Sequence, residues 1–203
     1  MFARYTTVRG DPNKIHSAID HADGQARAAV EGTEGSLGFG VVADAEGGRL
    51  IGASYWDSAE SMRASEAVLA DTRASAAAAL DGEVSIERFE VTLAFRHSIP
   101  ARGAAVRLSR FQVDPARVDE AISLIREESM PKVKGADGLC SFQQLLDRET
   151  GAGIIVSTWE SPAAFEAFWP VAEQLRARAS DRVGMRFSPL ETYTMIRTNV
   201  RLD

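Results

Sequence analysis

The sequence has few of the residues on which several protein classes depend. It contains one cysteine, Cys140, and three histidines. It therefore cannot form an intrachain disulfide, and a closed four-ligand zinc site would need carboxylates as well. The longest apolar runs, 37–43 and 74–80, are far shorter than the roughly 18 residues of a membrane-spanning helix. We expect no metal site and no membrane segment.

An excess of basic residues is also missing. Asp and Glu number 29 against 23 Lys and Arg, which gives a formal net charge of −6. This balance argues against binding to nucleic acid or to an anionic membrane, because both need a basic surface. Sixteen glycines and seven prolines are too few for a disordered chain. The first residues show no basic stretch followed by an apolar one, so a cytoplasmic protein is expected.

What the sequence does contain is an internal repeat. At an offset of 103 residues, Arg4–Ala76 aligns with Arg107–Ala179 without a gap, and 21 of the 73 aligned pairs are identical. Asp11-Pro12 then matches Asp114-Pro115, and Trp56 matches Trp159. Tryptophan and proline matching together indicate a duplication. We predict a first copy over 1–95, a linker over 96–104 and a second copy over 105–203.

Each copy predicts the order strand, helix, strand, strand, helix, strand. In the first copy, residues 2–9 form a β run, Asp11 can cap a helix, and residues 36–43 and 49–56 form a hairpin. The helix has an apolar stripe at spacings of three and four: Ile15, Ile19, Ala22, Ala26 and Val30. Ser58 and Ser161 are placed to cap the second helices.

This order is that of the ferredoxin-like βαββαβ unit. Helices cover only one face of its antiparallel sheet, so the other face needs a partner. We predict an α+β fold in which two ferredoxin-like repeats pack sheet to sheet as an intrachain dimeric α/β barrel. The chain would then be its own pseudodimer, and whether a further homodimer forms is left open.

The two predicted second helices differ in composition. The first copy is rich in alanine over 74–80, whereas the second carries Phe165, Phe168 and Trp169, followed by Pro170. Proline predicts a kink or break in the helix at that point. Small side chains leave room in the first copy, while a kink would open the second, so the sequence does not decide which copy keeps an open pocket.

These features carry a family resemblance. An Asp-Pro turn follows the first strand, Gly35 and Gly138 precede the second, and Trp56 and Trp159 end the third. The tract 158–168 is the closest match. The sequence resembles the antibiotic biosynthesis monooxygenase (ABM) family of the dimeric α/β-barrel superfamily, as a tandem version of what is usually a homodimer.

The resemblance implies oxygenation of polycyclic aromatic hydroquinones or anthrones by O₂ without metal or flavin, in a pocket between sheet and helices. A related branch degrades haem. The family's histidine, nine or ten residues after the tryptophan, is replaced by Ser65-Glu66 and by Phe168-Trp169. Without an imidazole for the iron, haem degradation is not expected, and we expect no cofactor.

Trp56, Trp159 and Arg107 are the candidate catalytic residues. Both tryptophans could equally cap the core. Arg107, with its counterpart Arg4, could bind an anionic substrate or phenolate, or could pair with a strand carboxylate of Glu87, Glu90 or Glu191. For six other residues packing or solvent exposure is favoured: Tyr5 and Tyr193, His16 and His21, His97, and Cys140.

Two functions remain open at this point. One is a cofactor-free monooxygenase acting on an aromatic, quinone-type small molecule. The alternative is a non-catalytic protein of the same fold that binds a small molecule or is associated with stress. The sequence shows no convincing general base, and fold alone does not decide between the two.

Overall fold

The computed structural model describes residues 1–202, which form an α+β fold. The chain divides into two compact units. The first unit contains Met1–Arg88 and Tyr193–Arg201, and the second contains Phe89–Thr192 with Leu202. None of the helices in the described part of the chain is long and apolar enough to cross a membrane.

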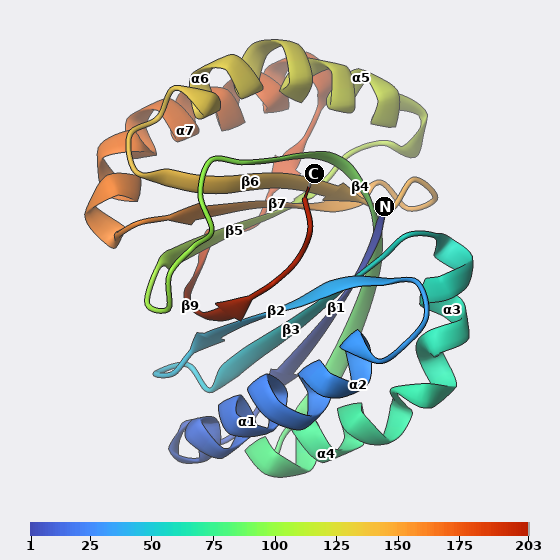
Figure 1. Ribbon diagram of the computed structural model, residues 1–203. Helices are drawn as coiled ribbons and strands as arrows, with labels where there is room; N and C mark the ends of the chain where they lie inside the picture. Colours follow the sequence, from blue (N-terminus) through green and yellow to red (C-terminus); the bar gives the residue numbers. More distant parts are fainter. Residues whose placement is uncertain (203) are drawn as a thin grey trace. The chain divides into compact units, whose positions relative to one another are not determined.

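The first unit is an antiparallel sheet with helices on one face (Figure 1). Within it the strands follow the order β4-β1-β3-β2-β9. The elements are β1 (Phe2–Arg9), a 3-10 turn (Pro12–Lys14), α1 (Ile15–His21), a π-helical turn (Ala22–Ala26), α2 (Arg27–Glu31), β2 (Ser36–Asp44), β3 (Arg49–Trp56), α3 (Ala59–Val68), α4 (Ala70–Leu80) and β4 (Glu83–Arg96).

The second unit has the same plan. Its strands pair in the order β8-β5-β7-β6-β4, and α5, α6 and α7 cover one face of the sheet (Figure 1). The elements that follow β4 along the chain are β5 (Ala105–Gln112), a 3-10 turn (Pro115–Arg117), α5 (Val118–Leu124), a π-helical turn (Ile125–Ser129), α6 (Met130–Lys134), β6 (Leu139–Leu146), β7 (Ala152–Trp159), α7 (Pro162–Val183), β8 (Arg186–Phe187) and β9 (Glu191–Thr198). Most of β9 belongs to the first unit.

Each unit takes one strand from the other sequence copy. The second part of β4 pairs with β6, with Phe95 opposite Phe142. The last strand, β9, pairs with β2, with Gly40 opposite Thr198. The units therefore divide at Arg88/Phe89 rather than at the linker over 96–104. The physical reason is that a strand edge with unpaired N–H and C=O groups is costly, and these strands cover it.

The first helix of each copy forms as its capping residue and apolar stripe predict. Asp11 and Asp114 accept hydrogen bonds from the backbone N–H of Asn13 and Ala116, each at 2.9 Å. The predicted stripe from Ile15 to Val30 is buried against the sheet. Both helices contain a five-residue π turn, and the two turns lie 103 residues apart. Such turns are frequent at functional sites.

The second helices differ from the prediction. Helix α7 runs unbroken from Pro162 to Val183 with Pro170 inside it, so of the two predicted outcomes, a kink or a break, the break does not occur. Pro170 and Glu166, whose carbonyl loses its helical donor to the proline, are both exposed, and water can satisfy that carbonyl. The interruption occurs instead in the first unit, where α3 ends at Val68 and α4 begins at Ala70.

Candidate functional site

A cavity of about 80 Å³ lies within the second unit, between its sheet and its helices. The strands β5, β6 and β7 form one wall, and α7 with the π turn forms the other. Most of the lining is apolar, and six aromatic side chains contribute to it: Phe142, Trp159, Phe165, Phe168, Trp169 and Phe187. The cavity therefore suits an aromatic molecule.

The aromatic side chains pack directly on one another. The ring of Trp159 lies 5.6 Å from that of Phe165 and 5.2 Å from that of Phe168, and Phe165 lies 5.5 Å from Trp169, centroid to centroid. The indole N–H of Trp159 donates to Ser157 Oγ at 2.9 Å. Trp159 is thus a fixed wall, whereas Phe168 and Trp169 are only half-buried and are freer to move.

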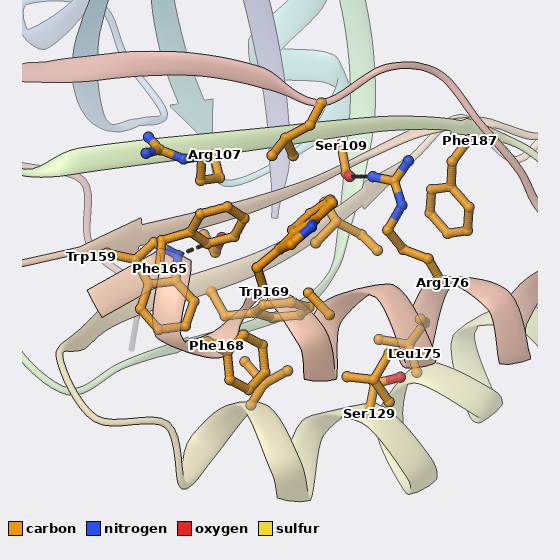
Figure 2. A pocket seen from close by; sticks show the side chains of 17 residues that line it. Arg107, Ser109, Ser129, Trp159, Phe165, Phe168, Trp169, Leu175, Arg176 and Phe187 are labelled. Atoms are coloured by element: carbon orange, nitrogen blue, oxygen red, sulfur yellow. Dashed lines mark hydrogen bonds between the residues drawn. The ribbon is translucent and has the colours of Figure 1, made fainter. Parts of the chain in front are cut away.

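Two arginines reach the same cavity from opposite sides. Arg107, on β5, lies 4.8 Å from the Phe165 ring and donates to the Val106 carbonyl at 3.2 Å. Arg176, on α7, lies 4.6 Å from the Phe187 ring and donates to Ser109 Oγ and, at 3.0 Å, to the Ser188 carbonyl. Figure 2 shows Arg107 and Arg176 at the two ends of the cavity, with Trp169 between them.

Neither guanidinium forms an ion pair with any carboxylate in residues 1–202. Burial lowers the pKa of Arg107, and the carboxylate of Glu166 acts to raise it. Burial likewise lowers the pKa of Arg176, against the effect of Glu173. An arginine stays protonated at neutral pH even so. The cavity therefore presents positive charge in apolar surroundings, which favours an anionic ligand.

The first unit has a cavity at the equivalent place, of about 50 Å³. Arg4 and Arg73 line it, at the positions that Arg107 and Arg176 occupy 103 residues later. Its lining is otherwise mainly aliphatic, and Phe39 is its aromatic member. The two cavities share an arginine pair, but only the second has an aromatic wall.

In the first unit the arginines are held by Glu66. Its carboxylate lies 3.3 Å from Arg4 Nη2 and 2.9 Å from Arg73 Nη2, and it also pairs with Arg88. Burial acts to raise the pKa of Glu66, but the hydrogen bond from Arg88 and the three positive charges outweigh it and hold the pKa below its ordinary value. The second unit has Trp169 at this position, so its arginines lack such a carboxylate.

The three candidate catalytic residues do not all lie at the same cavity. Trp159 and Arg107 both line the larger cavity. Trp56 is fully buried, donates to Ser54 Oγ at 3.0 Å, and is not part of the lining described for the first cavity. Sequence reasoning missed Arg73 and Arg176. A signal was present, because this pair is one of the identities in the self-alignment.

The remaining candidates lie outside both cavities. Tyr5 and Tyr55 share a hydrogen bond between their hydroxyls at 2.9 Å. Tyr193 is buried with Arg49 stacked 5.1 Å from its ring. Glu191, one of the carboxylates that could have paired with Arg107, pairs instead with Arg110 at 2.7 Å. Cys140 is buried, and its prediction as a core residue is confirmed.

The histidines also lie outside both cavities. His16 is exposed as expected, and His21 is half-buried and bonds the Thr72 carbonyl at 3.1 Å. His97 bonds the Lys134 carbonyl at 3.0 Å. Within residues 1–202, no histidine lines either cavity, and no three acidic, histidine or cysteine side chains are grouped to hold a metal ion. Neither cavity fits a haem that needs an imidazole ligand.

Comparison with known proteins shows which of them resemble this chain in sequence or in fold. No family model matches the chain. An uncharacterized protein of Mycobacterium tuberculosis is 29% identical over 184 residues, covering 91% of this chain and 82% of the relative. Among solved structures, an anthrone oxidase-like protein superposes with a TM-score of 0.73 at 16% identity, covering 98% of this chain and 92% of the other.

A second solved structure has the same fold. It is a ferredoxin-fold protein of Listeria monocytogenes related to antibiotic biosynthesis monooxygenases, with a TM-score of 0.58 at 13% identity over 97% of this chain and 95% of the other. This chain shares the fold of these two proteins. The resemblance drawn from the Asp-Pro turns and the strand-ending tryptophans is confirmed at the level of the fold. At these sequence identities, a shared fold does not imply a shared activity.

Proposed function

We propose that the protein is an ABM-like monooxygenase that oxidises an acidic aromatic small molecule with O₂, and that the cavity of the second unit is its active site. The proposal rests chiefly on one observation: Arg107 and Arg176 face an aromatic cavity without a carboxylate partner. In this proposal the two sequence copies form one intrachain pseudodimer and have specialised, with the aromatic site kept in the second.

The arginines account for the first step of such a reaction. A guanidinium beside a phenolic hydroxyl stabilises the phenolate and lowers the pKa of the phenol. The phenolate is a better electron donor to O₂ than the phenol, and the apolar lining keeps water from the reactive intermediate. One O₂ then converts a ring C–H into a C=O, the phenolic C–O becomes a second C=O, and the other oxygen atom leaves as water.

Each side chain has a distinct part. Arg176 is held by Ser109 and by the Ser188 carbonyl, so its guanidinium is already oriented before the substrate enters. Trp159 provides a fixed aromatic wall. A ring system larger than the present cavity requires Phe168 and Trp169 to move outward, and both side chains are only half-buried.

One observation favours the alternative, a protein that binds an aromatic anion without oxidising it. No carboxylate or imidazole belongs to the lining of the larger cavity in the described chain, so proton removal would fall to the solvent or to the substrate's own acidity. Both functions use the same arginines, and they differ only in whether O₂ is consumed.

The test is oxygen consumption with a panel of hydroquinones and anthrones. Arg176→Met should lower kcat/KM by at least about tenfold because it removes a charge that stabilises the developing anion, and Arg176→Lys should recover part of that loss. Arg178→Met is the matched control, since Arg178 lies on the same helix and pairs with Glu128. Its activity should stay within about twofold of wild type.

The outcomes separate the two functions. Saturable binding of an aromatic anion, weakened by Arg176→Met but without oxygen consumption for any panel member, would establish the binding protein. Neither binding nor turnover, or equal losses in Arg176→Met and Arg178→Met, would refute both.

A further inference from the structure

The cavity of the first unit has more positive than negative charge around it. Arg4, Arg73 and Arg88 converge on one carboxylate, Glu66. Arg4 is 1% exposed, so its charge is held away from water. Burial, together with the charges of Arg73 and Arg88, lowers the pKa of Arg4 to about 10 against the opposing effect of Glu66. A buried cluster of this kind is stabilised by a further anion.

Three hydrogen-bond donors in this cluster are buried and have no partner in the described chain: Nε and Nη1 of Arg4, and Nη1 of Arg73. The remaining nitrogen of Arg4, Nη2, is fully used by Ser65 Oγ at 2.9 Å, the Met62 carbonyl and Glu66. Native proteins rarely leave buried donors unpaired, because each one costs free energy. Since Arg4 and Arg73 both line the cavity, a ligand there can accept from them.

The rest of the lining limits what that ligand can be. The cavity is about 50 Å³, and apart from the arginines its lining is mainly aliphatic, with Ala22, Ala26 and Val30 among its residues. An inorganic oxyanion would leave this aliphatic surface uncovered. A polycyclic aromatic molecule would lack the stacking partners that the second unit provides. Two of the arginines line the cavity and Glu66 offsets one of their charges, so a single negative charge on the ligand offsets the other.

We propose that the first unit binds a short aliphatic monocarboxylate in this cavity, with its carboxylate accepting hydrogen bonds from Arg4 and Arg73 and its alkyl chain packed against Ala22, Ala26 and Val30. The site is separate from the aromatic cavity, and the proposal does not depend on the oxygenase function. Its test measures binding alone, so a failure of either proposal leaves the other standing.

The experiment is titration calorimetry of the full chain with butyrate, with neutral butyramide as the comparison ligand. Butyrate should bind saturably, and butyramide about 10- to 100-fold more weakly, because charge-assisted hydrogen bonds are lost. Arg73→Gln should weaken butyrate binding by a similar factor. Arg176→Gln, at the equivalent position of the second unit, should leave it within about twofold.

A second variant guards against misfolding as the cause of lost binding. Ala26→Leu keeps every charge and fills the space assigned to the alkyl chain, and it too should abolish butyrate binding. The absence of saturable butyrate binding to wild type overturns the proposal. Equal affinity for butyramide also overturns it, as does inorganic phosphate binding more tightly than butyrate. Loss of butyrate binding in Arg176→Gln alone would assign the ligand to the other unit.

Discussion

Replacing Glu66 with glutamine removes the carboxylate on which Arg4, Arg73 and Arg88 converge. Loss of one partner from a fully buried ion pair costs about 3–5 kcal/mol. The side chain of Glu66 is 30% exposed and that of Arg88 45%, so their part of the interaction is weakened by solvent. The contacts with Arg4 and Arg73, whose side chains are 1% and 15% exposed, are weakened less. We therefore expect a loss of about 2–3 kcal/mol.

For a chain of this size, that loss corresponds to a fall in Tm of about 5–10 °C. Thermal unfolding followed by circular dichroism at pH 7 measures it. Glu46→Gln is the control, because Glu46 lies exposed in the β2–β3 loop, and its Tm should change by less than about 1 °C.

The effect of Glu66→Gln on Tm should depend on pH. The pKa of Glu66 is lowered in the folded protein, so its stabilising effect is present above the ordinary carboxyl pKa and is lost as the pH falls through the lowered value. The Tm gap between wild type and Glu66→Gln should therefore be full at pH 7 and should close on acidification below about pH 4. A gap that is absent at pH 7, or that persists unchanged in acid, would refute the role assigned to Glu66.

Two further changes test the backbone and the aromatic wall. Gly138 has a φ of +74°, and a Cβ there would lie 2.7 Å from that of Ala164. Gly138→Ala should lower the free energy of unfolding, measured in urea, by about 2–3 kcal/mol. Gly103→Ala is the control, because Gly103 has open space around it, and it should lower the free energy of unfolding by about 1 kcal/mol. Equal losses in the two variants would contradict the predicted clash. Trp159→Phe should lower oxygen consumption at least about threefold, whereas Trp56→Phe should not, and the reverse order would place the site in the first unit.

Much of the fold could be predicted because its signals are local. The capping roles of Asp11 and Asp114, the hairpin between β2 and β3, and the caps at Ser58 and Ser161 depend on residues within a few positions of one another, and all are observed. At Pro170 local reasoning predicted a kink or a break, and the helix is not broken there. Whether a proline breaks a helix depends on the solvent access of a carbonyl, and that is a property of the folded molecule.

The candidate site could be predicted only in part. Trp159 and Arg107 stand out in the sequence because each matches a residue in the other copy. Arg176 also matches a residue in the other copy, Arg73. Its contribution to the cavity could not be predicted, however, since it depends on a helix folding back over a strand 67 residues away in the chain. The self-alignment shows that Glu66 in the first copy corresponds to Trp169 in the second. Only the structure shows that this position lies beside the arginine pair, so that the residue there decides whether the arginines have a carboxylate partner.

By itself, the sequence determined the element order, the helix caps and the apolar stripes, because these follow from periodicity and from side chains that bond their own backbone. Only the tertiary structure decided which strand completes which sheet and which charges meet. Strand exchange at β4 and β9, and the convergence of three arginines on Glu66, join residues distant in the chain. Contacts of this kind depend on how the strands and helices pack together, and the short-range pattern of the sequence does not encode them.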